Sequence, residues 1–280
     1  MVADPIEILA HTICQEHRYV FIKPCDAGAF KKTFHVRDGA NTDLALKLLV
    51  NAGNPGRVER EIAAHQACRH ANISRLLDVR TIEHQGQQLV YFLEEFLSGG
   101  TLQARLQNGR LSRSEGKQLA IALAGALAHL EPQGLVHRDI KPENVMYRVD
   151  GTPVLVDLGL ARHLNETSLT QTWMPHGPGT PIYASPEQLV NDKYLIDWRA
   201  DQFSLGVTLS IALLGIHPYA GNRAGNTEII ERMSRREAPQ PDFIHAATAE
   251  GLQLLIRMVD PWPIRRFARP EQLLDTWKAI

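Results

Sequence analysis

Residues 137–144 read HRDIKPEN and residues 157–159 read DLG, and these two segments decide how the whole chain is interpreted. They contain Asp139, Asn144 and Asp157, whose carboxylate and amide oxygens are the kind of ligand or acceptor that hard divalent cations prefer. The ordinary alternative is a solvated turn followed by a helix-capping aspartate. The length and order of the two segments make a functional site the better interpretation.

The composition predicts a folded chain with no strong electrostatic preference. Its 280 residues, 44% of them hydrophobic, can bury the core of one large domain or of two lobes. The 30 basic and 31 acidic side chains give a formal net charge of -1. This balance predicts neither a nucleic acid nor an anionic membrane as partner.

The cysteines and the apolar stretches indicate the cellular compartment of the chain. Cys14, Cys25 and Cys68 are an odd number without metal-ligand spacing, which favours a reducing compartment. The longest apolar stretches are interrupted or shorter than the roughly 20 residues that a bilayer crossing needs. We therefore expect a soluble, cytoplasmic chain without a membrane segment.

Strand patterns come first along the chain and helical patterns come later. Strands are expected at 18–23, 33–37, 43–49 and 89–95, with one amphipathic helix at 56–69. Further helices are expected at 113–130, 200–214, 227–235, 247–259 and 270–280, and a short hairpin at 145–149 and 154–156 that turns at Asp150-Gly151. This order predicts an α+β chain in two parts, residues 1–97 and 98–280.

The two central segments resemble the catalytic and metal-binding loops of the protein kinases. The signature of that family is H-R-D with an asparagine five residues after the aspartate, followed by D-F-G. The resemblance extends over nearly the whole chain. It implies a bilobal fold, with a small antiparallel-sheet N-lobe that carries one main helix and a larger, mostly helical C-lobe. It also implies ATP and magnesium as cofactors.

The resemblance assigns a role to each motif residue of the second part. Asp139 would orient the substrate hydroxyl and accept its proton, while Asn144 and Asp157 would hold magnesium. Lys141 stands where the serine/threonine members of the family keep a lysine that steadies the transferring phosphate. These residues are the expected catalytic and metal-binding groups.

In the first part, residues 44–47 read LALK and resemble the V-A-I-K strand of the family. Lys47 would contact the α and β phosphates. Glu61 would pair with Lys47 from the following helix, and Glu59 is the alternative partner.

The glycine-rich loop departs from the family pattern. Aligning G-x-G-x-x-G with this chain places Asp26, Gly28 and Lys31 at the three glycine positions. Gly28 is then the expected phosphate contact, because backbone amides must approach phosphate closely. The alternative is an ordinary hairpin without a phosphate contact. Either way, we expect modest nucleotide affinity.

The join between the two parts resembles the family's hinge. Backbone groups near Glu95 and Leu97 would bind adenine. The same alignment puts Glu94 at a position that is ordinarily apolar or small. Two alternatives stay open: a polar side chain at that position, or a register shift of one residue that points Glu94 to solvent.

Residues 179–187 read GTPIYASPE and resemble the family's G-T-P-x-Y-x-A-P-E segment. Thr180 would hydrogen-bond the catalytic loop. Glu187 would pair with Arg265 or Arg266, between which the sequence does not decide. Asp201 would anchor the catalytic loop from below.

Regulation by phosphate on the loop at 160–184 is expected from Arg138, because an arginine beside the catalytic aspartate often meets such a phosphate. The candidates are Thr170 and Thr172, followed by Thr167 and Ser168. The alternative is that they are ordinary polar loop residues.

Three functions fit the motifs. The first is an ATP- and magnesium-dependent kinase acting on serine or threonine of a protein substrate, with self-association for trans-autophosphorylation. The others are a nucleotide-binding pseudokinase or scaffold, and a small-molecule kinase of the same fold. The set of Lys47, Glu61, Asp139, Asn144 and Asp157 favours the first. The compact chain resembles bacterial members of the family.

Overall fold

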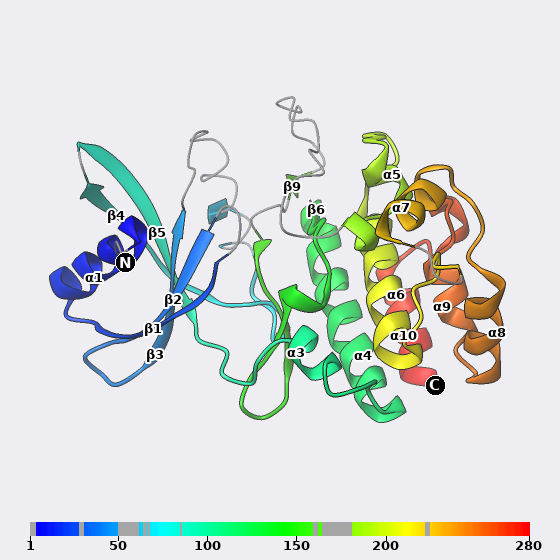
Figure 1. The fold of residues 1–280 in the computed structure, drawn as a ribbon, viewed down its shortest axis with the longest axis horizontal. Coiled ribbons are helices and arrows are strands. Elements are labelled where there is room, and N and C mark those ends of the chain that lie inside the picture. The colour runs from blue at the N-terminus through cyan, green and yellow to red at the C-terminus, as the bar shows by residue number, and fades with distance from the viewer. Residues whose placement is uncertain are drawn as a thin grey trace. The chain divides into compact units, whose positions relative to one another are not determined.

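The computed structural model describes residues 4–27, 31–49, 62–63, 66, 68–84, 86–158, 162–163, 181–221 and 225–280. The chain divides into two compact units, which are described separately. The first consists of Met1–Arg69 and Ser74–Ser98, and the second of His70–Ile73 and Gly99–Ile280. Figure 1 shows a sheet in the first unit and mainly helices in the second, so the α+β prediction is confirmed.

The first unit is built on an antiparallel five-stranded sheet with the order β1-β2-β3-β5-β4. The strands are β1 (Val20–Ala27), β2 (Lys31–Arg37), β3 (Asp43–Leu49), β4 (Leu76–His84) and β5 (Gln87–Glu95). Four of them were predicted from short β-branched or apolar runs separated by turn residues. The sequence missed β4, which lies at the sheet edge and fully buries only Ile82. An edge strand with one buried side chain carries little hydrophobic pattern.

Helix α1 (Pro5–His17) was also missed, although its start carries a helix signal. The side chain of Asp4 accepts a hydrogen bond from the N–H of Ile6, and Pro5 occupies the first turn. The buried residues of α1 join the hydrophobic cluster of the sheet; they are Leu9, Ala10, Ile13 and Cys14. The blue helix in Figure 1 thus covers apolar residues of β2, β3 and β5.

The second unit is mainly helical. Its helices are α3 (Leu102–Leu106), α4 (Arg113–Leu130), α5 (Pro186–Leu189), α6 (Trp198–Leu214), α7 (Asn226–Ser234), α8 (Pro241–Ala249), α9 (Gln253–Met258) and α10 (Pro270–Ala279). Helix α4 packs against both α6 and α10 (Figure 1), and its leucines are buried. The predicted single helix at 247–259 is wrong. The chain breaks it at Gly251, whose φ of 67° lies in the left-handed region.

Two small sheets complete the second unit. One pairs β6 (Leu135–Val136) with β9 (Arg162–His163), and the other pairs β7 (Val145–Tyr147) with β8 (Pro153–Leu155). The second is the predicted hairpin. Its turn contains Gly151 with a φ of 85°, and the Asp150 side chain accepts a hydrogen bond from the N–H of Thr152 at 2.9 Å.

The amphipathic helix predicted at 56–69 lies largely outside the described residues. Among the residues that the structure does describe, none of the helices has the length and apolar character to cross a membrane.

Candidate active site

The backbone of the HRD segment is held by one buried carboxylate from α6. Asp201 accepts hydrogen bonds from the N–H groups of His137 and Arg138, both at 2.7 Å. Burial raises the pKa of the Asp201 carboxyl, whereas these N–H bonds act in the opposite direction. Arg138 has a φ of 70°, so the two bonds hold a backbone conformation that arginine rarely adopts. The predicted anchoring role of Asp201 is confirmed.

His137 connects this loop to the strand that precedes Asp157. Its Nδ1 accepts a hydrogen bond from the N–H of Asp139 at 3.3 Å, which leaves the ring proton on Nε2. The Nε2–H then donates to the carbonyl of Val156 at 3.1 Å. A buried neutral imidazole therefore links the two motif segments.

The side chain of Asp139 is held by two neighbours on the same loop. Its Oδ2 accepts hydrogen bonds from Lys141 Nζ at 2.8 Å and from Asn144 Nδ2 at 2.7 Å. Asn144 also donates to the main-chain carbonyl of Asp139 at 2.8 Å. The structure thus brings three predicted site residues together and orients the Asp139 carboxylate before any substrate arrives.

Asp157 follows β8 with a φ of 68°, an unusual value for a residue other than glycine. The preceding residue, Val156, donates its N–H to the carbonyl of Asn144 at 2.9 Å. This bond places the Asn144 and Asp157 segments side by side. A strained backbone at such a point is typical of functional sites.

The residues present fit magnesium. Because the Asn144 amide nitrogen donates to Asp139, its side-chain oxygen faces away from that bond and is the ligand atom it offers. The Asp157 carboxylate is a second oxygen donor. Magnesium usually takes one or two protein carboxylates together with substrate phosphates, so this oxygen set suits it.

In the first unit, Lys47 forms an ion pair with Glu94 on the neighbouring strand. Lys47 Nζ lies 2.8 Å from Glu94 Oε2, and the side chains are 10% and 2% exposed. The alternative in which Glu94 points to solvent is therefore wrong. The sequence did not identify this partner, because it depends on how β3 and β5 align in space.

The two hinge residues remain predictions. The N–H of Glu95 donates to the carbonyl of Arg75 at 3.1 Å, so an adenine contact from Glu95 would have to use its carbonyl. Leu97 is buried, and both residues lie in the first unit.

Several predicted residues lie outside the part of the chain that the structure describes. They are Gly28, Glu59, Glu61, Thr167, Ser168, Thr170, Thr172 and Thr180, and the side chains of Asp26 and Lys31 are also not described. Their roles stay predictions.

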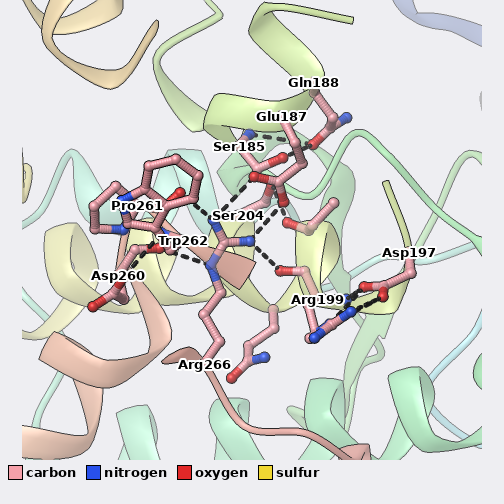
Figure 2. Close-up of polar contacts among 12 residues, drawn as sticks. Ser185, Glu187, Gln188, Asp197, Arg199, Ser204, Asp260, Pro261, Trp262 and Arg266 are labelled. Atoms are coloured by element: carbon pink, nitrogen blue, oxygen red, sulfur yellow. Dashed lines mark hydrogen bonds and ion pairs between the residues drawn. The ribbon is translucent and has the colours of Figure 1, made fainter. Parts of the chain in front are cut away.

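The partner of Glu187 is Arg266 and not Arg265, which is exposed. The guanidinium donates to both carboxylate oxygens at 2.6 and 3.0 Å and to the carbonyl of Arg199 at 2.8 Å. Figure 2 shows this arginine surrounded by its acceptors. Both charged side chains have no exposed surface. The bidentate pair fixes the start of α5.

His217 was not singled out in the sequence, yet it holds the segment just before α5. Its Nδ1 accepts from the N–H of Tyr219 at 3.1 Å, so its Nε2–H donates to the carbonyl of Ile182 at 2.8 Å. Only a neutral imidazole can accept a hydrogen bond at Nδ1 and donate one from Nε2 at the same time. A histidine two residues before a buried tyrosine is a weak signal, which explains why the sequence did not reveal it.

Protonation of His217 should therefore destabilise the fold. Burial lowers its pKa to about 4, below the ordinary value of about 6.5 in the unfolded chain. The neutral imidazole makes its full contribution to the free energy of unfolding above pH 6.5. This contribution falls by about 1.4 kcal/mol per pH unit as the pH drops from 6.5 towards 4. Urea unfolding of His217→Gln between pH 7.5 and 5 should show a weaker pH dependence than the wild type.

His245→Gln is the control for this prediction, because His245 is exposed. It should keep the wild-type pH dependence. If His217→Gln also keeps it, the neutral state assigned to this imidazole is wrong.

Sequence comparison places these motifs among known proteins. The family model of the protein kinase domain matches residues 21–277. CBL-interacting protein kinase 5 of Oryza sativa subsp. japonica is 28% identical over 267 residues, 93% of this chain and 56% of that protein. CBL-interacting serine/threonine-protein kinase 15 of Arabidopsis thaliana is also 28% identical, with 93% of this chain and 61% of that protein covered.

CBL-interacting protein kinase 4 of Oryza sativa subsp. japonica is 31% identical over 86% of this chain and 53% of that protein. The chain thus spans between 53% and 61% of the length of these three relatives. All three are plant proteins, so they give no support to the expected resemblance to bacterial members.

Proposed function

The chain belongs to the protein kinase domain family, and from this premise we propose that it transfers the γ-phosphoryl group of ATP to serine or threonine hydroxyls of proteins. The observation that carries the proposal is the Asp139 carboxylate held by Lys141 and Asn144. Phosphoryl transfer depends mainly on positioning and on charge stabilisation, and this arrangement provides both.

Each residue has one task in the proposed reaction. The Asp139 carboxylate orients the acceptor hydroxyl and takes its proton while the oxygen bonds to the γ-phosphorus and the bond to ADP breaks. The ammonium of Lys141 neutralises charge on the transferring group, and that of Lys47 binds the α and β phosphates. Asn144 and Asp157 would hold magnesium, which supplies positive charge to the phosphates.

Several features favour a protein substrate with serine or threonine. Lys141 stands at the position typical of the serine/threonine members. Small-molecule kinases of this fold usually carry H-G-D, whereas this chain has Arg138 and the segment at 179–187. The Arabidopsis thaliana relative is also named as a serine/threonine-protein kinase.

Regulation and location complete the proposal. Phosphate on Thr170 or Thr172, added by a second copy of the chain, would meet Arg138. A cytoplasmic location fits three free cysteines, of which Cys14 and Cys68 are buried, with their thiol pKa values raised to about 11 by burial.

The acceptor class can be tested with peptides that differ only in the acceptor residue. We expect purified protein with Mg-ATP to phosphorylate serine and threonine peptides and to leave the tyrosine version unmodified, measured by mass spectrometry. Nucleotide binding without transfer would favour the pseudokinase alternative. Transfer only to small alcohols would favour the small-molecule kinase.

A further inference from the structure

The ion pair between Lys47 and Glu94 is built into the sheet of the first unit. In the register of β3 and β5, Ala45 lies opposite Glu94 and Lys47 lies opposite Phe92. Directly opposite residues share a face of the sheet, and so do Ala45 and Lys47, which are two positions apart. Glu94 is therefore the diagonal neighbour of Lys47 on the same face.

The surroundings make this pair tight. The Nζ to Oε2 distance is 2.8 Å, and the side chains of Lys47 and Glu94 are 10% and 2% exposed. A carboxylate so far removed from water is costly unless a positive charge lies beside it. The register of β3 and β5 fixes both backbones, so the two side chains start from adjacent positions on one face of the sheet.

The pair restricts a side chain that is otherwise flexible. A lysine ammonium sits on a four-carbon stem with considerable rotational freedom and offers three N–H donors. The contact with Glu94 occupies one donor and limits the orientations of the stem. Phosphoryl transfer is faster when the ammonium is already held in the geometry in which it meets the phosphate oxygens.

We propose that Glu94 is a positioning residue for phosphoryl transfer, because its carboxylate holds the Lys47 ammonium in the orientation that the phosphates require. The inference rests on the proposed function. It assigns to a strand residue of the sheet a task for which the sequence suggested Glu61 or Glu59.

The test replaces Glu94 by glutamine, which keeps its size and removes its charge. With Mg-ATP and a serine peptide, Glu94→Gln should lower kcat by about 10-fold to 100-fold and leave the KM for the peptide unchanged. Glu83→Gln is the matched control, because Glu83 is an exposed glutamate on β4. Its kcat should equal that of the wild type.

The second expected result is that the effects of Glu94→Gln and Lys47→Met are not additive, which a merely structural role of Glu94 would not produce. In a Lys47→Met background, Glu94→Gln should cause no further loss of single-turnover rate, because the group it positions is gone. Should Glu94→Gln fail to fold, Glu94→Asp keeps the charge on a shorter side chain and should still lower kcat.

Two outcomes would overturn the inference while the wild type is active. The first is a kcat within two-fold of wild type in a folded Glu94→Gln or Glu94→Asp variant. The second is that Glu94→Gln lowers the single-turnover rate by the same factor in the Lys47→Met background as in the wild type. A wild type that transfers no phosphate contradicts the proposed function itself, and the inference falls with it.

Discussion

Replacement of Asp139 by asparagine should lower kcat by about 100-fold to 10,000-fold and leave the affinity for Mg-ADP within a few fold of wild type. Asparagine keeps the shape of the side chain but cannot accept the proton of the acceptor hydroxyl. Lys141 and Asn144, which both donate to Oδ2, would still find an amide oxygen. The fold should therefore persist, and only the chemical step should suffer.

The measurement combines single-turnover transfer to a serine peptide with calorimetric titration of Mg-ADP. Asp275→Asn is the control, because Asp275 is an exposed aspartate on α10. It should transfer phosphate at the wild-type rate. Equal rates for Asp139→Asn and the wild type would mean that another group accepts the proton.

Replacement of Arg266 by methionine should lower the free energy of unfolding by about 3 to 5 kcal/mol. The change removes the positive charge opposite Glu187. The Glu187 carboxylate, which has no exposed surface, then lacks its bidentate partner. The change also removes donors to the carbonyls of Arg199 and Asp260. An uncompensated buried charge is the largest cost among these.

Urea unfolding monitored by circular dichroism would measure this loss. Arg265→Met, at the exposed neighbouring arginine, should stay within about 0.5 kcal/mol of wild type. In the double variant Glu187→Leu, Arg266→Met, both charges are absent, so part of the stability should return. A loss below 1 kcal/mol in Arg266→Met alone would show that the pair does not anchor the start of α5.

Features with local causes were predictable from the sequence. Helix α4 begins and ends at the predicted residues, because Ser112 and Glu115 form a capping box at its start and an apolar stripe follows. The hairpin at Asp150-Gly151 follows from turn chemistry. The HRD and DLG segments carry their chemistry in consecutive residues, so the sequence alone was enough to propose their roles.

Features that depend on pairing across the chain were not predictable. Glu94 becomes the partner of Lys47 only through the register of β3 and β5. The choice of Arg266 over Arg265 is set by the 3₁₀ turn Pro263–Arg265, which buries one arginine and exposes the other. Helix α1 had a capping signal, but the sheet surface that it covers exists only after folding.

Kinase activity itself can be tested by phosphosite mapping. Purified wild-type protein would be incubated with Mg-ATP, with and without chelation of the magnesium, and its products would be mapped by mass spectrometry. We predict phosphate on serine or threonine residues of the chain or of an added protein only when magnesium is present. Tight ATP binding with no phosphate on any protein hydroxyl would contradict the proposed phosphoryl transfer.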